Sequence, residues 1–298
     1  MGMDFSNHEG FIWFDGELIP WNDAKVHILT HGLHYASSVF EGERCYDGNI
    51  FLETEHSERF IRSAQLIDMK MPYSVEELNA AKHEVLKANN LTNAYIRPVA
   101  WRGSEELGIS AQKTKTHVAI AAWEWPSYFG EEAREKGISL MTAKWRAPMP
   151  DTATTASKAA GLYATHTMSK HAAEDKGYTD ALMLDYRGLV AECTGANIFM
   201  IKDGAIKTPD PDCFLDGLTR QTVIKLAHEH NIPLEVCQIK PEELLEADEI
   251  FVTGTAAEIT AIGKIDETEY TVGPITRQLR DAYEALVRGQ PQPQAKSA

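Results

Sequence analysis

The first 50 residues alternate short apolar runs with turn residues. The runs FIWF (11–14) and ELIPW (17–21) flank Asp15-Gly16, and the runs SVFEGERCY (38–46) and NIFLE (49–53) flank Asp47-Gly48. Asp-Gly between two apolar runs favours a two-residue turn, because both central positions of that turn need a positive φ. The pattern therefore predicts two β-hairpins in this part of the chain.

Helical spacing follows the hairpins. One face of residues 56–68 is apolar at the interval of a helix, through Phe60, Ile61, Ala64 and Ile67. The run Ser74-Val75-Glu76-Glu77 is a capping box and predicts a second helix that ends near residue 89. Apolar runs at residues 94–101 and 117–125 are predicted strands.

The second half begins after a polar, glycine-bounded stretch, SYFGEEAREKG (127–137), which is the predicted linker. Hairpin turns are predicted at Tyr186-Arg187-Gly188 and Asp203-Gly204. The other predicted elements are a strand at 138–145, a helix at 161–176, a helix at 220–229, a strand at 249–254 and a helix at 274–288.

This order of elements lacks regular βαβ alternation, so it favours an α+β (mixed α/β) fold over a doubly wound sheet. We expect an N-terminal α/β domain over residues 1–126, the linker at 127–137 and a C-terminal α/β domain over 138–289. The polar, proline-rich residues 290–298 are a predicted disordered tail.

Composition narrows the class of protein. The 298 residues are 43% hydrophobic and 24% charged, as in ordinary globular enzymes. The net charge of −15 repels phosphate backbones and argues against nucleic-acid binding. The sequence shows neither a secretion signal nor an apolar run that could span a membrane, so a cytoplasmic protein is expected. In that compartment Cys45, Cys193, Cys213 and Cys237 are expected to be free thiols.

One lysine stands apart from other charges. Lys158 lies in TTASKAAGLY (154–163), among small residues. It is either a solvated loop lysine or a lysine neutral enough to attack a carbonyl carbon.

Two glycine loops could bind an anion. Asp216-Gly217-Leu218-Thr219-Arg220 enters a predicted helix, and Thr253-Gly254-Thr255-Ala256-Ala257 follows an apolar strand. Unpaired N–H groups and hydroxyls at such positions suit a phosphate, although plain helix capping is the alternative for each loop. The sequence contains no Walker motif and no GxGxxG after a strand, which argues against nucleotides.

Other polar residues lie within apolar surroundings. Glu192 lies between an apolar strand and a Gly-Ala-Asn turn, where it is either solvated or the partner of a protonated ring nitrogen. Alternation places Tyr95 and Arg97 on one face of a strand, which suits a carboxylate or open solvent. The histidines at 27, 31 and 34 have helical spacing but no acidic cluster, so we expect solvated or core histidines and no metal site.

A lysine that attacks carbonyls, a phosphate cradle and a carboxylate for a ring nitrogen together indicate pyridoxal 5'-phosphate. The segments IWFDGELIPWNDAKVHILTHGLHYASSVFEG, AYIRP, SKAAGLY, GLTRQ and ADEIFVTGTAAEIT occur in this order. Together they resemble the branched-chain-amino-acid aminotransferases, class IV pyridoxal-phosphate enzymes of fold type IV with the two-domain D-alanine-aminotransferase-like fold. The resemblance covers residues 11–288.

The resemblance implies roles for individual residues. Lys158 matches the catalytic lysine that holds the cofactor covalently, and Glu192 matches the acid at the pyridine nitrogen. The remaining cofactor-binding matches are Arg59, Leu218, Thr219 and Thr255 at the phosphate and Tyr163 at the phenolic oxygen. The substrate-binding matches are Tyr95 with the Thr255 and Ala256 backbone for the α-carboxylate, Arg97 and Arg44 for a second carboxylate, and Tyr35, Phe40, Trp125 and Tyr128 as apolar walls.

The resemblance also implies an activity. The expected reaction is ping-pong transamination between L-leucine, L-isoleucine or L-valine and 2-oxoglutarate. The expected assembly is a cytoplasmic homodimer or a higher homo-oligomer, in which a loop near Leu107–Ile109 closes the other subunit's site. The alternatives on the same fold are a D-amino-acid or (R)-amine transaminase and an aminodeoxychorismate lyase. The alternative of another class is a non-catalytic protein that binds a phosphate ligand.

The chain departs from the family's usual pattern after Lys158, in the acid motif and before Arg44. Leu162 replaces an asparagine, and Cys193 and Ala196 replace a glycine and a second glutamate. Ala196 therefore removes a carboxylate that could orient Arg59. Glu43 replaces an apolar residue, and we expect it to add negative charge near the substrate's entrance.

Overall fold

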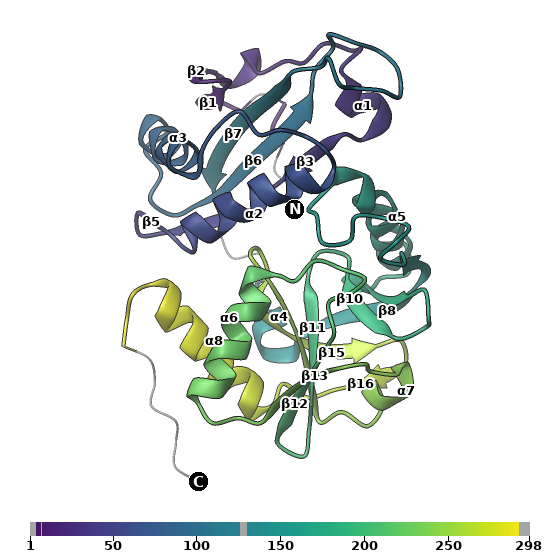
Figure 1. The fold of residues 1–298 in the computed structure, drawn as a ribbon. Helices are drawn as coiled ribbons and strands as arrows, with labels where there is room; N and C mark the ends of the chain where they lie inside the picture. Colours follow the sequence, from purple (N-terminus) through teal and green to yellow (C-terminus); the bar gives the residue numbers. More distant parts are fainter. Residues whose placement is uncertain (1–3, 7, 126–129, 292–298) are drawn as a thin grey trace. The chain divides into compact units, whose positions relative to one another are not determined.

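The computed structural model describes residues 4–6, 8–125 and 130–291. The chain forms two compact units (Figure 1). The first unit comprises Met1–Pro126 and Ser157–Gly161, and the second comprises Ser127–Ala156 and Leu162–Ala298. Helices and strands are mixed in both units, which confirms the predicted mixed α/β class.

The first unit is built on a sheet of seven strands in the order β2-β1-β7-β6-β4-β5, with β3 paired to β6. Its strands are β1 (Phe11–Phe14), β2 (Glu17–Pro20), β3 (Ser38–Phe40), β4 (Glu43–Tyr46), β5 (Asn49–Ile50), β6 (Ala94–Arg102) and β7 (Thr116–Glu124). Its helices are the 3-10 turn η1 (Trp21–Asp23), α1 (His31–Tyr35), α2 (Glu53–Leu66) and α3 (Val75–Ala88). Helix α3 packs against β1 and β7, and α2 packs against α3 and β3.

The two Asp-Gly hairpins are confirmed. Asp15 and Gly16 have φ values of 49° and 104°, and Asp47 and Gly48 have 50° and 88°. The predicted capping box is also present, because Ser74 and Glu77 exchange side-chain and backbone hydrogen bonds at the start of α3. Helix α2 begins at Glu53, three residues before its predicted start. Acidic residues in its first turn stabilise the helix through their interaction with its dipole.

The second unit is built on a sheet of nine strands in the order β10-β9-β8-β15-β14-β11-β12-β13, with β16 paired to β15. Because β10 also pairs with β11, part of this sheet closes into a ring. The strands are β8 (Ile138–Ala147), β9 (Asp180–Asp185), β10 (Val190–Cys193), β11 (Asn197–Lys202), β12 (Ala205–Pro209), β13 (Leu234–Cys237), β14 (Glu249–Gly254), β15 (Glu258–Ile265) and β16 (Thr268–Glu269). Side chains of these strands form an apolar core that includes Leu140, Ile198, Val252 and Ile262.

The helices of the second unit pack on the strands of its sheet. They are α4 (Glu131–Lys136), the 3-10 turn η2 (Ala160–Leu162, which begins in the first unit), α5 (Tyr163–Glu174), α6 (Leu218–Glu229), α7 (Pro241–Leu244) and α8 (Pro274–Val287). Helix α5 packs on β8 and β9, while α6 and α8 lie side by side and both pack on β14 (Figure 1).

The predicted linker at 127–137 differs from the structure from residue 131 onward. Helix α4 occupies this stretch, and the bounding glycines are its caps, with Gly137 at a φ of 77°. Arg134 donates two hydrogen bonds to the Glu284 carboxylate on α8, at 2.5 and 2.9 Å. Polar side chains bounded by glycines thus mark a capped surface helix of the second unit here. Residues 126–129 and most of the predicted tail, 292–298, lie outside the described residues.

The second difference from the predicted domains concerns Ser157–Gly161, which belong to the first unit and not to the C-terminal domain. Ala159 forms a β-bridge with Val39, and Ser157 Oγ donates a hydrogen bond to the carbonyl of Ser63 at 2.9 Å. Hydrophobic patterning could not reveal this exchange, because the segment carries small residues that suit either unit.

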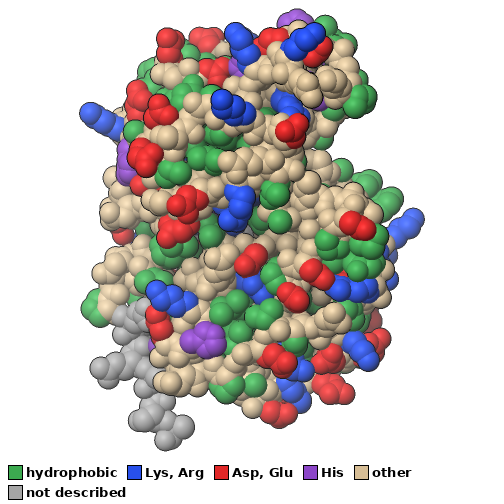
Figure 2. Space-filling view, viewed as in Figure 1, with side chains coloured by type: hydrophobic (Ala, Val, Ile, Leu, Met, Phe, Trp, Pro, Cys, Tyr) green, Lys and Arg blue, Asp and Glu red, His purple; other side chains and the backbone are tan. Residues whose placement is uncertain are grey.

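The charged surface side chains, the helix lengths and the state of the cysteines can be compared with the expectations from composition. On the face that Figure 2 shows, acidic and basic side chains are interspersed. Within the described residues, no helix combines the length and the apolar character needed to cross a membrane. All four cysteines are free thiols, as predicted.

A charged cluster ties the first hairpin to the loop between β6 and β7. His117 on β7 contacts Asp15 Oδ2 at 2.5 Å and Glu105 Oε1 at 3.3 Å, and its ring stacks on Trp101. Burial would lower the pKa of His117, but Asp15 and Glu105 outweigh it, so the pKa is raised. The folded state therefore binds this proton more tightly than the unfolded chain does.

We predict that His117→Gln weakens the dependence of stability on pH. A raised pKa contributes stability that is fully present below the unfolded value and is lost as the pH rises through the folded value. Melting temperatures measured from about pH 6 to about pH 9 should fall more steeply for the unmodified protein than for the variant. Parallel curves for the two proteins would show that this cluster contributes no linked proton.

Candidate active site

Lys158 is held by its backbone in the first unit. Its N–H donates to Ser63 Oγ on α2 at 3.0 Å, and its carbonyl accepts from Phe40 N at 3.2 Å. Its Nζ lies 4.8 Å from the centre of the Phe40 ring. Lys158 is half-buried and its backbone is fixed from two elements, which argues against a solvated loop lysine.

Strand β6 presents a phenol and a guanidinium on one face. Arg97 Nη2 donates to Tyr95 Oη at 3.0 Å, and the Arg97 guanidinium lies over the Phe40 ring at 4.9 Å. Phe40 therefore contacts both Arg97 and Lys158. Tyr95 is buried, so the open-solvent alternative is wrong for it. Arg97 Nε is buried without a hydrogen-bond partner among the described residues, and a substrate carboxylate could supply one.

The close approach of Tyr95 depends on Gly42. A Cβ at position 42 would lie 1.9 Å from Tyr95 Oη, so any side chain there would displace the phenol. Arg44 on β4 stands opposite Tyr95 in the sheet and covers the Tyr46 ring. The Trp125 ring lies 4.9 Å from that of Tyr95. These contacts bring Arg44, Tyr95 and Trp125 together.

Of the other two expected apolar walls, Tyr35 is not part of this group. Tyr35 lies at the end of α1, where it is exposed and its ring contacts those of His31 and His34. Tyr128 lies outside the described residues. His31 is buried between Ser37 Oγ at 2.6 Å and the Gly108 carbonyl at 2.9 Å, so it is a core histidine that ties the 103–115 loop to α1.

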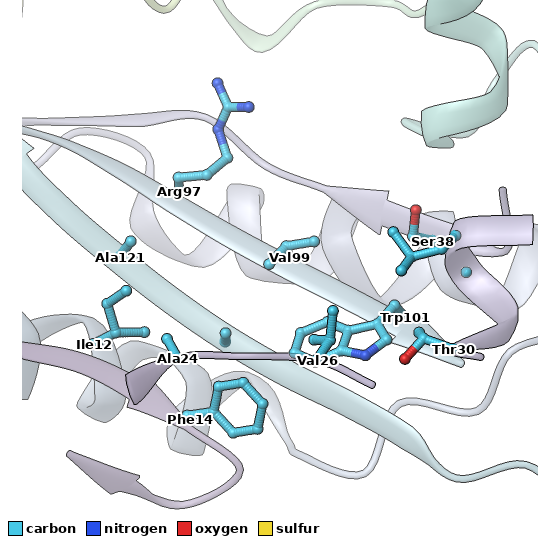
Figure 3. Close-up of a pocket in the computed structure, with 13 residues that line it drawn as sticks. Ile12, Phe14, Ala24, Val26, Thr30, Ser38, Arg97, Val99, Trp101 and Ala121 are labelled. Atoms are coloured by element: carbon cyan, nitrogen blue, oxygen red, sulfur yellow. The ribbon is translucent and has the colours of Figure 1, made fainter. Parts of the chain in front are cut away.

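An apolar groove continues from Arg97 along β6. Its volume is about 360 Å³, and Val99, Trp101 and Ala121 line it, with Arg97 at its edge (Figure 3). Alternation explains this order, because Tyr95, Arg97, Val99 and Trp101 all face the same side of the strand. One face of β6 thus changes from polar to apolar along its length.

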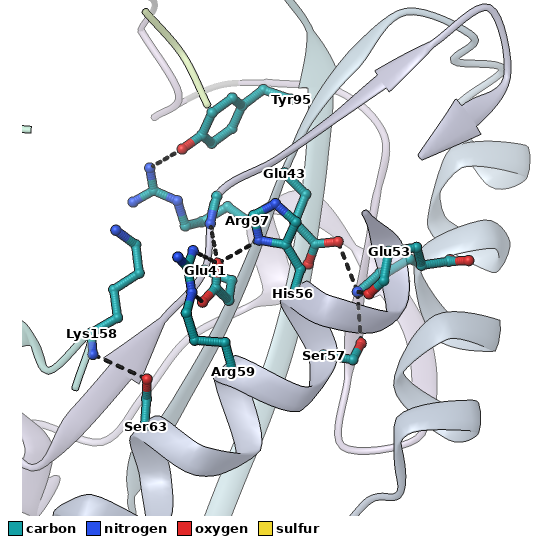
Figure 4. A network of polar contacts seen from close by, with 12 residues as sticks. Glu41, Glu43, Glu53, His56, Ser57, Arg59, Ser63, Tyr95, Arg97 and Lys158 are labelled. Atoms are coloured by element: carbon teal, nitrogen blue, oxygen red, sulfur yellow. Dashed lines mark hydrogen bonds and ion pairs between the residues drawn. The ribbon is translucent and has the colours of Figure 1, made fainter. Parts of the chain in front are cut away.

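Arg59 on α2 is held by a carboxylate that the sequence analysis missed. Glu41 accepts from Arg59 Nε at 2.7 Å and from Arg59 Nη2 at 2.8 Å, and it also accepts from His56 Nδ1 at 2.8 Å (Figure 4). The signal was present in SVFEGERCY, where two acids interrupt an otherwise apolar predicted strand. Glu41 therefore orients Arg59 from within the first unit, although Ala196 has replaced the family's second glutamate.

The expectation for Glu43 is wrong. Its side chain is fully buried and pairs with Lys82 Nζ on α3 at 2.7 Å. Alternation explains the difference, because Arg44 faces Tyr95 and its neighbour Glu43 must face the other side, toward α3. Burial raises the pKa of Glu43, against the opposing effect of Lys82. Glu43 therefore adds no charge to the Tyr95–Arg97 group.

The second unit assembles its own group of polar residues on adjacent strands. Glu192 on β10 pairs with Asn197 on β11, and Asn197 pairs with Thr253 on β14. Glu192 Oε1 lies 3.2 Å from His166 Nε2, and the His166 ring lies 5.2 Å from that of Tyr163. His166 is a second residue that the sequence analysis missed, because a histidine on a helix carries no specific signal. The structure thus places Glu192 and Tyr163 around one imidazole.

The two candidate anion loops lie beside this group. Gly217 is the N-cap of α6 and donates to Asn197 Oδ1 at 3.1 Å, so Asn197 fixes the start of the helix that Leu218 and Thr219 begin. The first N–H groups of a helix have no partner within it and attract anions. Gly254, just before Thr255 and Ala256, packs against the Gly195 carbonyl. Thr253 Oγ1 is buried without a hydrogen-bond partner among the described residues.

These donor sets match the chemistry of pyridoxal 5'-phosphate. In the first unit, Lys158 supplies an amine for an aldehyde and Arg59 supplies donors for a phosphate. In the second unit, Glu192 supplies an acceptor for a ring N–H, and the start of α6 supplies N–H donors for an anion. A metal centre is not supported by the acidic cluster of Asp185, Asp212 and Cys213 in the second unit. Arg187 already pairs with both carboxylates there, at 2.6 and 2.9 Å.

Comparisons with known proteins identify the family. The model of the class IV amino-transferases matches residues 38–265. A branched-chain-amino-acid aminotransferase of Pseudomonas aeruginosa is 42% identical over 99% of this chain and 98% of its own length. The corresponding enzyme of Escherichia coli K12 is 40% identical, covering 94% of each chain.

Solved structures agree with the sequence relatives. The branched-chain amino acid aminotransferase of Escherichia coli gives a TM-score of 0.92 at 39% identity, over 95% of this chain and 96% of that one. The enzyme of Thermobaculum terrenum, solved in its PLP-form, gives a TM-score of 0.86 at 32% identity over 95% of each chain. These matches confirm the predicted fold. The chain therefore belongs to the class IV aminotransferases, within their branched-chain-amino-acid aminotransferase group.

Proposed function

We propose that this protein is a pyridoxal-phosphate-dependent transaminase that exchanges amino groups between L-leucine, L-isoleucine or L-valine and 2-oxoglutarate. The observation that carries the proposal is the position of Lys158. Its backbone is fixed by α2 and β3, and Phe40 lies under both its amine and the guanidinium of Arg97. The Arg97 guanidinium could bind a carboxylate of an amino-acid substrate, and the Lys158 amine could remove the proton from its α-carbon.

Each unit carries residues proposed to bind the cofactor. From the first unit, Lys158 would bind the aldehyde and Arg59 the phosphate. From the second unit, Glu192 would accept the ring N–H, Tyr163 would lie beside the phenolic oxygen, and Leu218, Thr219 and Thr255 would bind the phosphate. The solved relative from Thermobaculum terrenum is in its PLP-form, which supports the assignment.

When bound, pyridoxal 5'-phosphate supplies an aldehyde that takes up the amino group and an electron-poor ring that stabilises charge at the substrate α-carbon. Lys158 Nζ would accept the proton from that α-carbon as a general base and would then donate it to the carbon of the cofactor's aldehyde group. Glu192 would accept a hydrogen bond from the ring N–H, and His166 Nε2, at 3.2 Å from Glu192 Oε1, would hold that carboxylate in place. These residues move and hold protons, while Arg59 and α6 hold the phosphate.

Substrate recognition must serve two kinds of acid. Tyr95 and the backbone of Thr255 and Ala256 would bind the α-carboxylate shared by all substrates. Arg97 and Arg44 would bind the second carboxylate, which 2-oxoglutarate has and leucine lacks. Phe40 and Trp125 would contact an aliphatic side chain. Apolar rings beside arginines, as seen around Tyr95, allow one site to accept both classes.

We predict that Lys158→Ala abolishes turnover, with a fall of at least about 100-fold from the loss of proton transfer alone. Borohydride reduction should fix the cofactor to residue 158 of the unmodified chain, as mass spectrometry of its peptides would show, and not to the variant. Lys144→Ala is the control, because Lys144 is an exposed lysine of the second unit. Turnover within tenfold of the unmodified protein would exclude Lys158 as the catalytic residue.

We predict that Arg97→Ala separates the two half-reactions. Loss of a charge-assisted hydrogen bond in a buried site weakens binding by about ten- to a hundredfold, and only 2-oxoglutarate would use it. Single-turnover rates should therefore fall more with 2-oxoglutarate than with leucine. Arg102→Ala is the matched control on the same strand, because Arg102 contacts the Ile67 carbonyl instead. Equal losses in both half-reactions would assign Arg97 to the α-carboxylate or to structure.

We also propose that the protein is a homodimer. Exposed apolar side chains gather on the first unit, in the segment before and within α1 and in the 103–115 loop: Val26, Ile28, Leu29, Leu33, Leu107 and Ile109. His31 joins these segments through the Gly108 carbonyl. An apolar surface of this kind is typical of a protein interface, and a second copy would bury it.

We predict that Ile109→Asp dissociates the dimer. Ile109 is 82% exposed, so a folded monomer tolerates the change, whereas a buried aspartate opposes association. Light scattering after size exclusion should show twice the chain mass for the unmodified protein and one chain mass for the variant. Leu245→Asp, at an exposed apolar position of the second unit, should remain dimeric. A dimer for Ile109→Asp would place the interface elsewhere.

A further inference from the structure

The connection between β3 and β4 has an unusual composition for a buried segment. Glu41, Gly42 and Glu43 follow Phe40, and all three are buried, with both carboxylates at 0% exposure. The backbone here cannot shift easily. Glu41 N–H donates to the Pro98 carbonyl at 2.9 Å, and Gly42 packs against the Tyr95 phenol. The two carboxylates therefore start from fixed points on the sheet.

Glu41 contacts Arg59 through a pair of parallel hydrogen bonds. Arg59 uses Nε and Nη2 for this pair, at 2.7 and 2.8 Å, and Nη1 takes no part in it (Figure 4). A bidentate carboxylate fixes the plane and the direction of a guanidinium, which a single hydrogen bond does not. The direction in which Nη1 points is therefore set by Glu41.

Two further donors complete the coordination of this carboxylate. His56, one helical turn before Arg59 on α2, donates to Glu41 Oε2 at 2.8 Å, and Gly42 N–H donates to the same oxygen at 3.3 Å. Burial would raise the pKa of Glu41, but Arg59 and His56 outweigh it and hold the pKa well below its usual range. The hydrogen bonds and this direction of the pKa both favour the ionised form of Glu41.

The second carboxylate offers a comparison within the same chain. Glu43 pairs with Lys82, which also donates to Ser57 Oγ at 2.7 Å and to the Glu53 carbonyl at 3.2 Å. These contacts join β4, α2 and α3. The partner of Glu43 is thus a lysine in the helix packing, and the partner of Glu41 is the arginine assigned to the phosphate.

We infer that Glu41 is the positioning residue of Arg59, which it holds in the direction needed to bind the cofactor's phosphate. This inference rests on the proposed function. It concerns binding of the phosphate and not the chemistry at the aldehyde, so a ligand with and a ligand without the phosphate can test it. Pyridoxal 5'-phosphate and pyridoxal differ only in that group.

The experiment compares the affinity ratio of pyridoxal 5'-phosphate to pyridoxal, measured by absorbance titration, in four proteins. They are the unmodified protein, Glu41→Asp, Glu41→Gln and Glu43→Gln, each with its melting temperature. Glu41→Asp keeps the charge but shortens the reach, and Glu41→Gln keeps the shape but removes the charge. Both Glu41 variants should lower the ratio about tenfold, because a charge-assisted contact to the phosphate is misaligned.

Glu43→Gln is the matched control. It removes one charge of a neighbouring buried ion pair, so it should lower the melting temperature and leave the ratio unchanged. Unchanged ratios in folded Glu41 variants would overturn the inference, and so would an equal fall in Glu43→Gln. Failure of the unmodified protein to bind pyridoxal 5'-phosphate would instead overturn the proposed function and this inference with it.

A measurement on the unmodified protein applies even where the Glu41 variants do not fold. The Nε–H of Arg59, assigned in an ¹⁵N spectrum by its absence in Arg59→Lys, should exchange slowly with solvent before any ligand is added, because Glu41 Oε1 already accepts it. Added inorganic phosphate should leave that exchange slow. Rapid exchange in the free protein would show that Arg59 is not held in advance and would overturn the inference.

Discussion

Four hydrogen bonds converge on the two oxygens of the Glu41 carboxylate, two from Arg59 and one each from His56 and Gly42 N–H. They join the sheet of the first unit to α2, and α2 in turn carries Ser63, which fixes Lys158. Removing one partner of such a buried pair costs roughly 3–5 kcal/mol, because the other charge stays desolvated and unpaired. The residues proposed to bind the phosphate and the amino group therefore share one anchor.

In the second unit, a neutral side chain fixes the start of the helix that is proposed to bind the phosphate. Asn197 joins β11 to the start of α6, and its ladder neighbours are Glu192 and Thr253. An amide can donate and accept at once, and Asn197 accepts from Gly217 N–H and donates to the Leu215 carbonyl. It therefore fixes this stretch of chain without adding charge. The two units thus use an ion pair and an amide for the same purpose of fixing a phosphate donor.

Local patterns in the sequence predict those features of the structure that depend on interactions between residues close together in the chain. The Asp-Gly turns, the Ser74–Glu77 capping box and the shared face of Tyr95 and Arg97 each depend on residues within a few positions of one another. Glu41, His166 and the Glu43–Lys82 pair depend on partners 18, 26 and 39 positions away, and no local pattern specifies such a partner. The sequence predicts a linker at 127–137, and the structure has a helix at residues 131–136. The pattern could not distinguish the two, because glycines are found at the ends of linkers and of capped helices alike. The isolated Lys158 could be singled out, since small neighbours around a lone charge are unusual on a surface.

The placement of Ser157–Gly161 in the first unit has a consequence for how the chain folds during synthesis. The first unit includes a segment that lies beyond the start of the second, so its 126 N-terminal residues do not contain all of it. On a ribosome, Val39 must wait for Ala159 to emerge before their bridge can form. The ordering of the lysine segment is therefore tied to the chain having passed into its second unit, and an N-terminal fragment released early would leave this part of the sheet without its partner.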